Sequence, residues 1–418
     1  MPAQTLIYLI SLCAIAGVII RPFRVPEVVW AVAGAVLMVA LQLILPSEAL
    51  SGIAKGTDVY LFLTGMMLLA EVAREEKLFD WLAAQATNHA GGSSKRLFFM
   101  IYAVGIIVTA LLSNDATAVV LTPAVAAAVR AAKVAKPLPY LLICAFIANA
   151  ASFVLPISNP ANLVIYGAHM PPLLQWLPRY MLPSLLSIGV TCVVLYGTQR
   201  KSLTTGINKG ITVPPLSGTG KVAALGIGIT AIVLLASSAF DIPLGLPTVL
   251  TGILTSGIVL LKARKTPWTI IRGISWSILP LVAGLFVIVE ALDKTGIVRA
   301  IGALLRQTAA HSVARAAWGG GMTIAFASNL MNNLPAGLIA SHTTQIAHVP
   351  EIVRSSILIG VDLGPNLSVT GSLATILWLV ALRREGQTVS AWTFLKLGLL
   401  IMTPALLCAL GALWLQSS

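Results

Sequence analysis

Apolar stretches about as long as a membrane-spanning helix recur from one end of this 418-residue chain to the other. A helix needs about 20 apolar residues to cross a bilayer, and the stretches at 6–20, 28–45, 222–239 and 397–415 reach or approach that length. The composition agrees, because only 10% of the residues are charged, against about 25% in soluble proteins. We therefore expect an all-α, polytopic membrane protein without a separate soluble domain.

The net charge of +13 does not indicate nucleic-acid binding, because the basic residues are spread over short loops between the apolar stretches. Membrane proteins retain such residues on the cytoplasmic side of the bilayer. The four cysteines form neither a C-x-x-C motif nor a Cys/His cluster, so we expect no metal and no cofactor. Motifs for ATP hydrolysis or acyl transfer are also missing. These features exclude nucleic acid as a partner, leave membrane lipid as one, and favour a transporter over an enzyme.

Hydropathy divides the chain into two halves, 1–197 and 221–418, joined by a polar linker at 198–220. We expect five spans in each half, ten in all, near 4–20, 26–46, 58–73, 138–170 and 180–197, and near 222–240, 247–263, 275–292, 353–382 and 390–415. Each half also contains two apolar arms around a polar tip. These segments are 97–130, with Asn114-Asp115 at the tip, and 314–347, with Asn332-Asn333.

Basic residues flank the first pair of arms on both sides, with Lys95 and Arg96 before it and Arg130 and Lys133 after it. Both ends should therefore lie in the cytoplasm, which makes the segment a re-entrant hairpin. Irregular backbone at membrane depth is tolerated only inside protein or beside a cavity. We expect the second pair of arms to form a hairpin as well.

With the hairpins set aside, 19 of the 27 Lys and Arg residues fall on one side of the membrane, seven fall on the other and one lies at a span edge. This bias places the linker in the cytoplasm and both termini in the periplasm. Because five spans is an odd number, the second half must enter the membrane inverted. Inverted repeats with broken helices and a central site are typical of secondary transporters.

Weak sequence echoes support the repeat. Glu71 and Glu290 both end a third span, Asn114-Asp115 matches Asn332-Asn333, and Asn149 matches Asp362. For Glu71 and Glu290 we expect side chains that reach toward the membrane interface.

Two spans should break in the middle. Pro156 and Pro160 interrupt 138–170, and Gly364, Pro365 and Gly371 interrupt 353–382. A break frees backbone groups and points half-helix ends at the membrane centre. We predict a substrate site there, made of polar side chains from the hairpin tips and the breaks: Asn114, Asn159, Asn162, Asn332, Asn333, Ser372 and Thr375.

Asp115 and Asp362 are the acids expected near mid-membrane, and intramembrane carboxylates are functional candidates. No Lys or Arg is expected at that depth, so both groups should gain and lose protons near neutral pH. We predict that they couple transport to protons. Structural roles remain open: Asp115 as a cap at the hairpin tip, and Asp362 as an acceptor for backbone N–H groups at the break.

The strings L-L-S-N-D-A-T-A-V-V-L-T-P at 111–123, S-N-L-M-N-N-L-P at 328–335 and G-V-D-L-G-P-N-L-S-V-T-G-S-L-A-T-I-L-W-L at 360–379 resemble the bacterial arsenite/antimonite efflux permeases of the ion transporter superfamily. The resemblance runs through nearly the whole chain. It implies inverted repeats with two hairpins and two broken helices, and export of trivalent arsenic and antimony across the inner membrane, as the neutral trihydroxide, in exchange for protons.

The resemblance also implies that a cytoplasmic arsenite-stimulated ATPase can dock on such a permease. This chain departs from relatives that carry an acid where it has Asn149, which leaves more of the coupling to Asp115 and Asp362. The predicted site offers amides and hydroxyls, which suit a neutral polyhydroxyl substrate, and no Arg fork for an oxyanion.

Two other functions remain open. One is a sodium-coupled carboxylate or sodium/proton transporter of the same fold. The other is a membrane anchor whose main task is to recruit an ATPase, although the linker is short for an elaborate docking surface.

Overall fold

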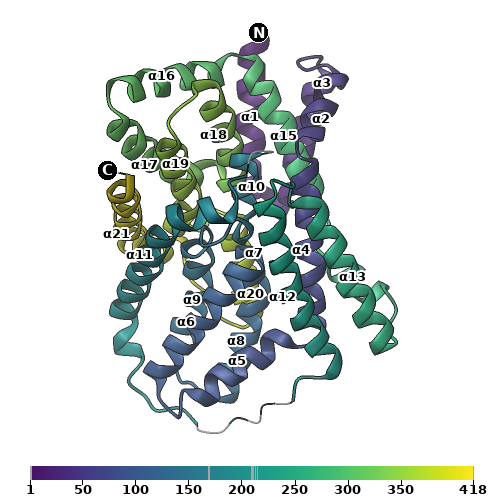
Figure 1. The fold of residues 1–418 in the computed structure, drawn as a ribbon, viewed down its shortest axis with the longest axis vertical. Coiled ribbons are helices and arrows are strands. Elements are labelled where there is room, and N and C mark those ends of the chain that lie inside the picture. Colours follow the sequence, from purple (N-terminus) through teal and green to yellow (C-terminus); the bar gives the residue numbers. More distant parts are fainter. Residues whose placement is uncertain (1, 168–169, 209–210, 212, 214, 418) are drawn as a thin grey trace.

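The computed structural model describes residues 2–167, 170–208, 211, 213 and 215–417, and every regular element within them is a helix (Figure 1). The elements up to the linker are α1 Ala3–Ile20, η1 Pro22–Arg24, α2 Glu27–Ala40, α3 Pro46–Lys55, α4 Thr57–Glu75, α5 Leu78–His89, α6 Ser94–Leu111, α7 Asn114–Ala116, η2 Thr117–Leu121, α8 Thr122–Ala131, α9 Leu138–Ala150, η3 Pro156–Ser158, α10 Pro160–Tyr166, α11 Leu173–Gln199 and η4 Arg200–Ser202.

The elements after the linker are α12 Gly218–Ala239, α13 Gly245–Ala263, α14 Trp268–Gly273, α15 Ile278–Lys294, α16 Ile297–His311, α17 Val313–Met331, α18 Asn333–Ala347, α19 Glu351–Leu363, η5 Gly364–Leu367, α20 Leu373–Arg384 and α21 Ala391–Ser417. Helical structure extends to Ser202 and resumes at Gly218, so the non-helical part of the linker is shorter than 198–220. The linker positions 209, 210, 212 and 214 lie outside the described residues.

Six of the described helices are long and apolar enough to cross a membrane: α1, α6, α11, α12, α13 and α21. Helices α3 and α4, which meet at a 50° bend, make a seventh span if they are taken together. This confirms a polytopic, all-α membrane protein. The count of ten spans stays a prediction, because α2, α9 and α15 are each shorter than 18 residues.

One set of helices, here called the scaffold, comprises α1–α4 and α12–α15. Within it α4 packs along α13, α13 along α12, and α2 between α1 and α15. The α4–α13 crossing is tight, because a Cβ atom at Gly65 would lie only 2.3 Å from the carbonyl oxygen of Thr248. Small residues permit such close backbone contact between membrane helices.

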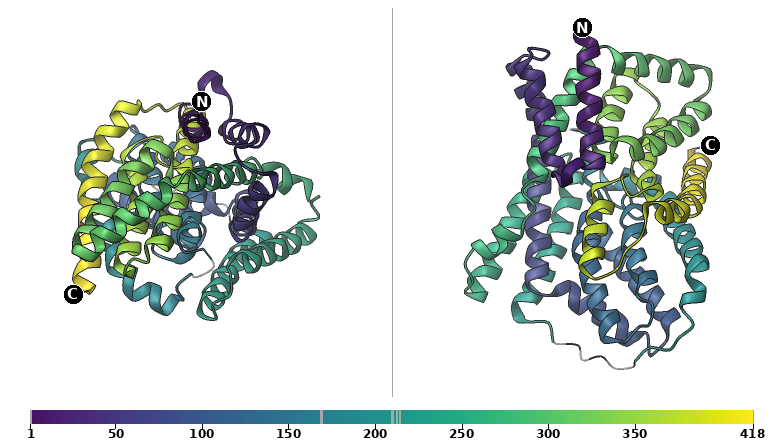
Figure 2. Two further views of the ribbon diagram at one scale, coloured as in Figure 1. Left: turned by 90° about the horizontal axis from the view of Figure 1, so that it is seen from above. Right: turned by 180° about the vertical axis from the view of Figure 1, so that it is seen from behind.

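The second set, here called the hairpin bundle, comprises α6–α11 and α16–α21. Helix α17 packs on α19, α11 on α21, α6 on α9 and α10 on α18. Viewed from above, this bundle lies to one side of the splayed pair α12–α13 (Figure 2). The cavity described below lies where the two sets of helices meet.

The segment predicted as the first hairpin starts at the linker end of the molecule and returns to the same end. Helix α6 leads up to the break at Leu112-Ser113, and η2 with α8 leads back. Two consecutive linker residues contact its two ends, since Ile207 N donates to Gly92 O at 3.1 Å and Asn208 N donates to Ala132 O at 3.0 Å. By length and composition α6 counts as a candidate span, while the chain returns toward the linker end through η2 and α8, so the re-entrant hairpin stays a prediction.

The second hairpin, α17 and α18, has its base at the opposite end. Helix α16 runs directly into α17, and Arg306 of α16 donates a hydrogen bond to Ile346 O near the end of α18. Figure 1 shows α16 and the linker at opposite ends of the molecule, with the N-terminus at the α16 end. The two polar tips therefore point toward each other from opposite ends of the molecule, and the inverted repeat stays a prediction.

Two helices break at the centre. Helix α9 ends at Ala150 and α10 begins at Pro160, while α19 ends at Leu363 and α20 begins at Leu373. Both breaks contain a short 3-10 turn, η3 and η5, that begins at or next to a proline. In the second break the regular helix ends at Leu363, directly before Gly364 and Pro365, whereas in the first it ends at Ala150 and Pro156 and Pro160 begin the short turn and the next helix.

Candidate functional site

Four helices begin near the centre, and each is capped by a polar side chain that accepts a backbone N–H bond. Ser113 Oγ accepts from Ala116 N at 3.2 Å and Asn159 Oδ1 from Ala161 N at 3.0 Å. Asn332 Oδ1 accepts from Leu334 N at 3.4 Å and Ser372 Oγ from Thr375 N at 3.1 Å. These caps satisfy N–H groups that the helix starts leave free, and they fix where the positive helix ends lie.

Side-chain hydrogen bonds join the two broken helices. Asn159 Nδ2 donates to Asp362 Oδ1 at 2.8 Å, across 203 residues of sequence. Asn149 Nδ2 donates to Asn366 Oδ1 at 3.0 Å and to Thr375 Oγ1 at 3.4 Å. All five side chains are buried, so the two breaks form one polar network inside an apolar bundle.

Asp362 is the acid of this network, and 0% of its surface is exposed. Its Oδ2 has no hydrogen-bond partner and neither oxygen is in an ion pair within the described part of the chain. A buried carboxyl group without a cation is costly to keep in a membrane protein, which makes Asp362 a functional candidate.

Each hairpin is tied to the break in its own half. Ser158 Oγ, in the first break, donates to Ala110 O of α6 at 3.1 Å. Asn333 N, at the tip of the second hairpin, donates to Gly371 O in the second break at 2.9 Å. A movement of either hairpin would consequently be transmitted to its broken helix.

A cavity of about 80 Å³ lies between the tip of the first hairpin and the scaffold. Ser113, Asp115 and Pro160 line its hairpin-bundle side, and Glu71 and Gly273 are among the residues of its scaffold side. The remaining lining residues are Leu63, Met66, Met67, Ala70, Ala116, Val119, Val120, Ile274, Ser275, Ile278 and Leu377. The described wall of this cavity thus carries two carboxylates and no Lys or Arg.

The structure brings most of the predicted site residues into these contacts. Asn159, Asp362, Ser372 and Thr375 belong to the network between the breaks, and Asn333 contacts the second break. Asn114 lies beside the cavity, but its buried Oδ1 accepts from its neighbour Asp115 N at 2.9 Å.

Asn162 and Asn332 stabilise backbone rather than line the cavity. Asn162 Nδ2 donates to Ser152 O at 3.0 Å and to Pro156 O at 3.3 Å, which holds the first break in shape. Asn332 has a φ of 73° and a ψ of 154°, a positive-φ conformation outside the left-handed helical region, and its Oδ1 caps Leu334 N. The hydrogen bonds of Asn162 and the backbone conformation of Asn332 favour a local structural role for both residues.

The structural roles left open for the two acids do not hold. The cap at the tip of the first hairpin is Ser113, and the carboxylate of Asp115 instead lines the cavity. Asp362 accepts from the Asn159 side-chain amide, not from backbone N–H groups at its own break. Both carboxyl groups are therefore available for a role other than holding the backbone.

The expectation that Glu71 reaches toward the interface is wrong. Its side chain is 7% exposed, and it accepts from Arg74 Nε at 2.8 Å while lining the cavity with Asp115. Glu290 lies nearer solvent, at 19% exposed, and pairs with Lys55 of α3 at 2.6 Å. The positions of Glu71 and Glu290 at the ends of their apolar stretches do not reveal this difference, because burial of Glu71 depends on packing against helix α14.

Asn366 and Asn329 were also missed as site residues. Asn366 bridges Asn149 and the carbonyl oxygen of Phe146, and Asn329 Oδ1 accepts from Ser368 Oγ at 2.7 Å. Asn366 directly follows Pro365, so its position at the predicted break could have identified it as a site residue from the sequence.

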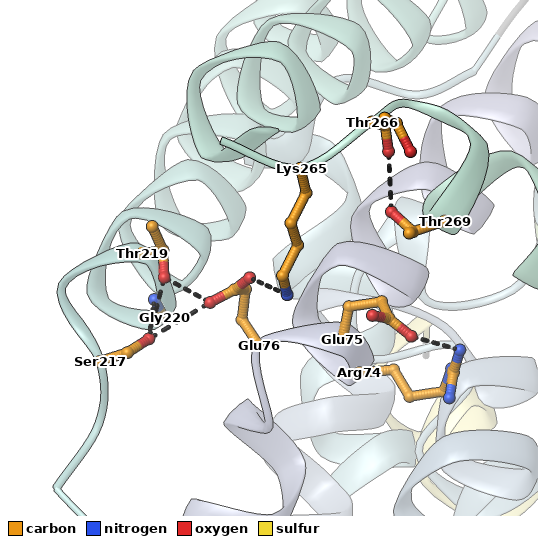
Figure 3. Close-up of polar contacts among 9 residues, drawn as sticks. All are labelled: Arg74, Glu75, Glu76, Ser217, Thr219, Gly220, Lys265, Thr266 and Thr269. Atoms are coloured by element: carbon orange, nitrogen blue, oxygen red, sulfur yellow. Dashed lines mark hydrogen bonds and ion pairs between the residues drawn. The ribbon is translucent and has the colours of Figure 1, made fainter. Parts of the chain in front are cut away.

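At the linker end, buried Glu76 joins α4 to the start of α12 and the end of α13 (Figure 3). Ser217 Oγ donates to Glu76 Oε2 at 3.2 Å, Thr219 donates to the same oxygen, and Lys265 Nζ donates to Oε1 at 3.1 Å. Burial alone would raise the pKa of Glu76, but the hydrogen bonds from Thr219 and Lys265, together with the Lys265 charge, hold it below its ordinary value. This cluster fastens the scaffold directly beyond the cavity.

Comparison with known proteins places this architecture among membrane transporters. The Alcanivorax borkumensis YdaH transporter superposes with a TM-score of 0.58 at 14% identity, over 88% of this chain and 86% of that one. Neisseria gonorrhoeae MtrF superposes with a TM-score of 0.56 at 12% identity, over 99% and 94%. At these identities the likeness concerns the fold alone.

Relatives with curated names are closer in sequence. An arsenical pump membrane protein of Yersinia enterocolitica is 27% identical over 364 residues, covering 84% of this chain and 85% of that protein, and the one from Escherichia coli K12 gives the same values. An uncharacterized transporter of Mycobacterium tuberculosis is 23% identical over 97% of both chains. The resemblance to arsenical permeases is thereby confirmed.

The family model described as "Citrate transporter" matches residues 15–359, well over half of the chain. This match agrees with the helical membrane architecture and with the transporters that share its fold. The chain therefore belongs to the citrate transporter family and is a multi-pass membrane transporter similar to the arsenical pump membrane proteins.

Proposed function

We propose that the chain is a secondary active exporter of trivalent arsenic and antimony, which leave the cell as the neutral trihydroxide in exchange for protons and so confer arsenic resistance. The observation that carries this proposal is the cavity between hairpin and scaffold, whose described wall holds Asp115 and Glu71 and no cation. Glu71 is paired with Arg74, so the carboxylate of Asp115, which has no ion pair among the described residues, is the group that repels anions such as arsenate or citrate, whereas it admits neutral molecules and protons.

The chemistry of the site suits a trihydroxide. Hydroxyl and amide groups both donate and accept hydrogen bonds, and Ser113 and Ser275 bring such groups to the cavity. Asp115 makes no ion pair among the residues described. In this proposal Asp115 and Asp362 carry the protons, and Asn159, Ser372, Thr375, Asn114 and Asn333 position the substrate and the helix ends that surround it.

The transport cycle proposed here uses two inverted repeats of five spans each, with the hairpin bundle moving against the scaffold. The hairpins enter from opposite ends of the molecule, which supports the repeat. The excess of basic residues at the linker end supports an inner-membrane orientation with both termini in the periplasm.

The test is arsenite counterflow in proteoliposomes that contain the purified chain, measured with and without a pH gradient. We expect counterflow without a gradient and net accumulation of arsenite when the gradient drives it. Transport by the chain alone would exclude a mere anchoring role, and addition of a cytoplasmic arsenite-stimulated ATPase would then show whether such a partner increases it. Absence of any arsenite flux under all these conditions would refute the proposal.

The family's description favours one alternative, a sodium-coupled carboxylate transporter. Carboxylates can bind to Ser, Asn and Thr side chains and helix N-termini when sodium neutralises them. Citrate uptake that requires a sodium gradient and ignores arsenite would select this alternative in the same proteoliposomes.

A further inference from the structure

Glu71 is a buried acid of the scaffold, and neither the proton carriers Asp115 and Asp362 nor the substrate residues account for it. It lies on α4, five residues before the Glu76 anchor, and its side chain faces the cavity that Asp115 lines from the other side. We propose that Glu71 is the proton-transfer residue between Asp115 and the solvent at the linker end of the molecule. This inference rests on the proposed function, since it assigns a path to the protons exchanged there.

On the side of α14, the carboxylate of Glu71 fills the space that a side chain at Gly273 would occupy. A Cβ atom at Gly273, the last residue of α14, would lie 1.5 Å from Glu71 Oε1. The absence of a side chain at Gly273 therefore permits the carboxylate to lie against α14. Any larger residue at 273 would displace it.

Arg74, one turn further along α4, connects Glu71 to solvent. Its side chain is 47% exposed, whereas that of Glu71 is 7% exposed. Arg74 also pairs with Glu75 at 2.9 Å, on the solvent side of the helix (Figure 3). The sequence of groups from solvent inward is thus Arg74, Glu71, the cavity and Asp115.

Within the described part of the chain, no charged residue other than Glu71 and Asp115 lines this cavity. Asp115 is the other titratable residue that lines the cavity, while α14 and the turn after it contribute Gly273, Ile274 and Ser275. The charged residues nearest to this end of the helices packed on α4 are Asp80 of α5, Lys221 of α12, Lys262 of α13 and Arg272 of α14, all exposed or half-buried, with Arg272 over the Trp268 ring. Glu71 and Asp115 are therefore the pair of acids that share this space.

The proposed step moves one proton and leaves every other bond unchanged. The O–H bond of protonated Asp115 breaks, the proton passes through cavity water to a Glu71 oxygen, and Glu71 then loses it to bulk water. A cavity of about 80 Å³ has room for several waters at roughly 10–15 Å³ each by this measure of volume. Arg74 stays paired with Glu71 at the solvent-facing end of this path.

The experiment compares two fluxes in proteoliposomes of the full chain carrying Glu71→Gln. Arsenite uptake driven by a pH gradient requires net proton transfer, whereas arsenite counterflow at equal pH does not. We expect driven uptake to fall by about tenfold or more, as for loss of a positioned acid–base group, and its pH profile to flatten, while counterflow, which can lose some activity because Glu71 lines the cavity, falls by a much smaller factor. Glu71→Asp, which keeps a carboxylate, should restore much of the driven uptake.

Glu75→Gln is the matched control, because Glu75 is the adjacent acid, also pairs with Arg74, and does not line the wall shared with Asp115. It should leave both fluxes unchanged. Equal loss of counterflow and driven uptake in Glu71→Gln, or no loss of either, would overturn the proposal. If the unaltered chain shows no arsenite counterflow, the proposed function itself fails, and that outcome is distinguishable because it does not depend on Glu71.

Discussion

The Glu76 cluster permits a quantitative prediction, because one carboxylate holds three segments of the scaffold. We consider Glu76→Gln, which keeps the size of the side chain but removes its charge. The carboxylate accepts two hydroxyl bonds on one oxygen and a Lys265 bond on the other. A glutamine must turn its NH₂ group toward either the two hydroxyls or the Lys265 ammonium group. At least one hydrogen bond is then lost, because the NH₂ group and the group that it faces are both donors.

Hydrogen bonds to a buried charge contribute about 1.5–3 kcal/mol each. The Lys265 contact counts for less, about 0–1 kcal/mol, because the lysine side chain is 40% exposed and such pairs are screened by water. Loss of the charge should therefore destabilise the protein by about 2–3 kcal/mol. At roughly 2–4 °C per kcal/mol for domains of 150–250 residues, and less for larger ones, the apparent melting temperature should fall by about 3–6 °C.

The assay is thermal denaturation in detergent, followed by size-exclusion chromatography of the protein that remains monodisperse. Glu75→Gln is the control, since Glu75 has a 30% exposed side chain and a single ion pair with the half-exposed Arg74, for which we expect a change within about 1 °C. Equal melting temperatures for the two variants would refute the reasoning, because they would show that the buried cluster contributes no more than a surface pair.

The same cluster predicts a pH dependence. The pKa of Glu76 is held below its ordinary value of 4.5, so folding favours the ionised carboxylate. Its contribution is fully present above about pH 4.5 and is lost as the pH falls below that value through the lowered pKa. The difference in melting temperature between Glu76→Gln and the unaltered chain should accordingly shrink under acid conditions and stay constant from pH 6 to 8.

Three further changes test other parts of the structure. Asp362→Asn should abolish pH-driven arsenite uptake in everted vesicles while the protein stays folded, because an asparagine can still accept from Asn159; normal transport at all pH values would show that Asp362 carries no proton. Asn159→Ala should lower stability by about 1–3 kcal/mol, since it leaves the buried Asp362 Oδ1 without its donor, and thermal denaturation measures this. Gly65→Ala should destabilise by about 1–3 kcal/mol through overpacking against Thr248, whereas Gly257→Ala in α13, which meets open space, should be neutral or stabilising.

Much of the fold was predictable because its signals are local. Apolar length marks α1, α11, α12, α13 and α21 directly, and no tertiary contact is needed to recognise them. The breaks were predictable for a similar reason, since Pro156 and Pro365 each remove a backbone donor and disfavour a regular helix, although Pro178, Pro183 and Pro404 are accommodated inside α11 and α21. The number of spans was harder to establish, because a broken span consists of two pieces that are each too short to cross.

The partners of the site residues could not be predicted from such local signals. The sequence indicates that Asn159 and Asp362 are polar groups at mid-membrane, but their hydrogen bond spans 203 residues and depends on how the two breaks cross. The same holds for Asn149, whose partner Asn366 lies 217 residues away.

For Glu71, the predicted depth in the membrane does not suffice to predict the environment of the side chain. Glu71 and Glu290 occupy equivalent span ends in the sequence, and depth alone predicts the same interfacial role for both. Their surroundings differ: the carboxylate of Glu290 meets Lys55 from α3, whereas that of Glu71 lies against the bare backbone of Gly273 and beside the cavity. Hydropathy specifies how far a residue lies from water along the membrane normal, but it does not specify which helix the side chain faces. For a transporter whose two halves enclose the site, that direction decides whether an acid forms a surface ion pair or lies on the path of a proton.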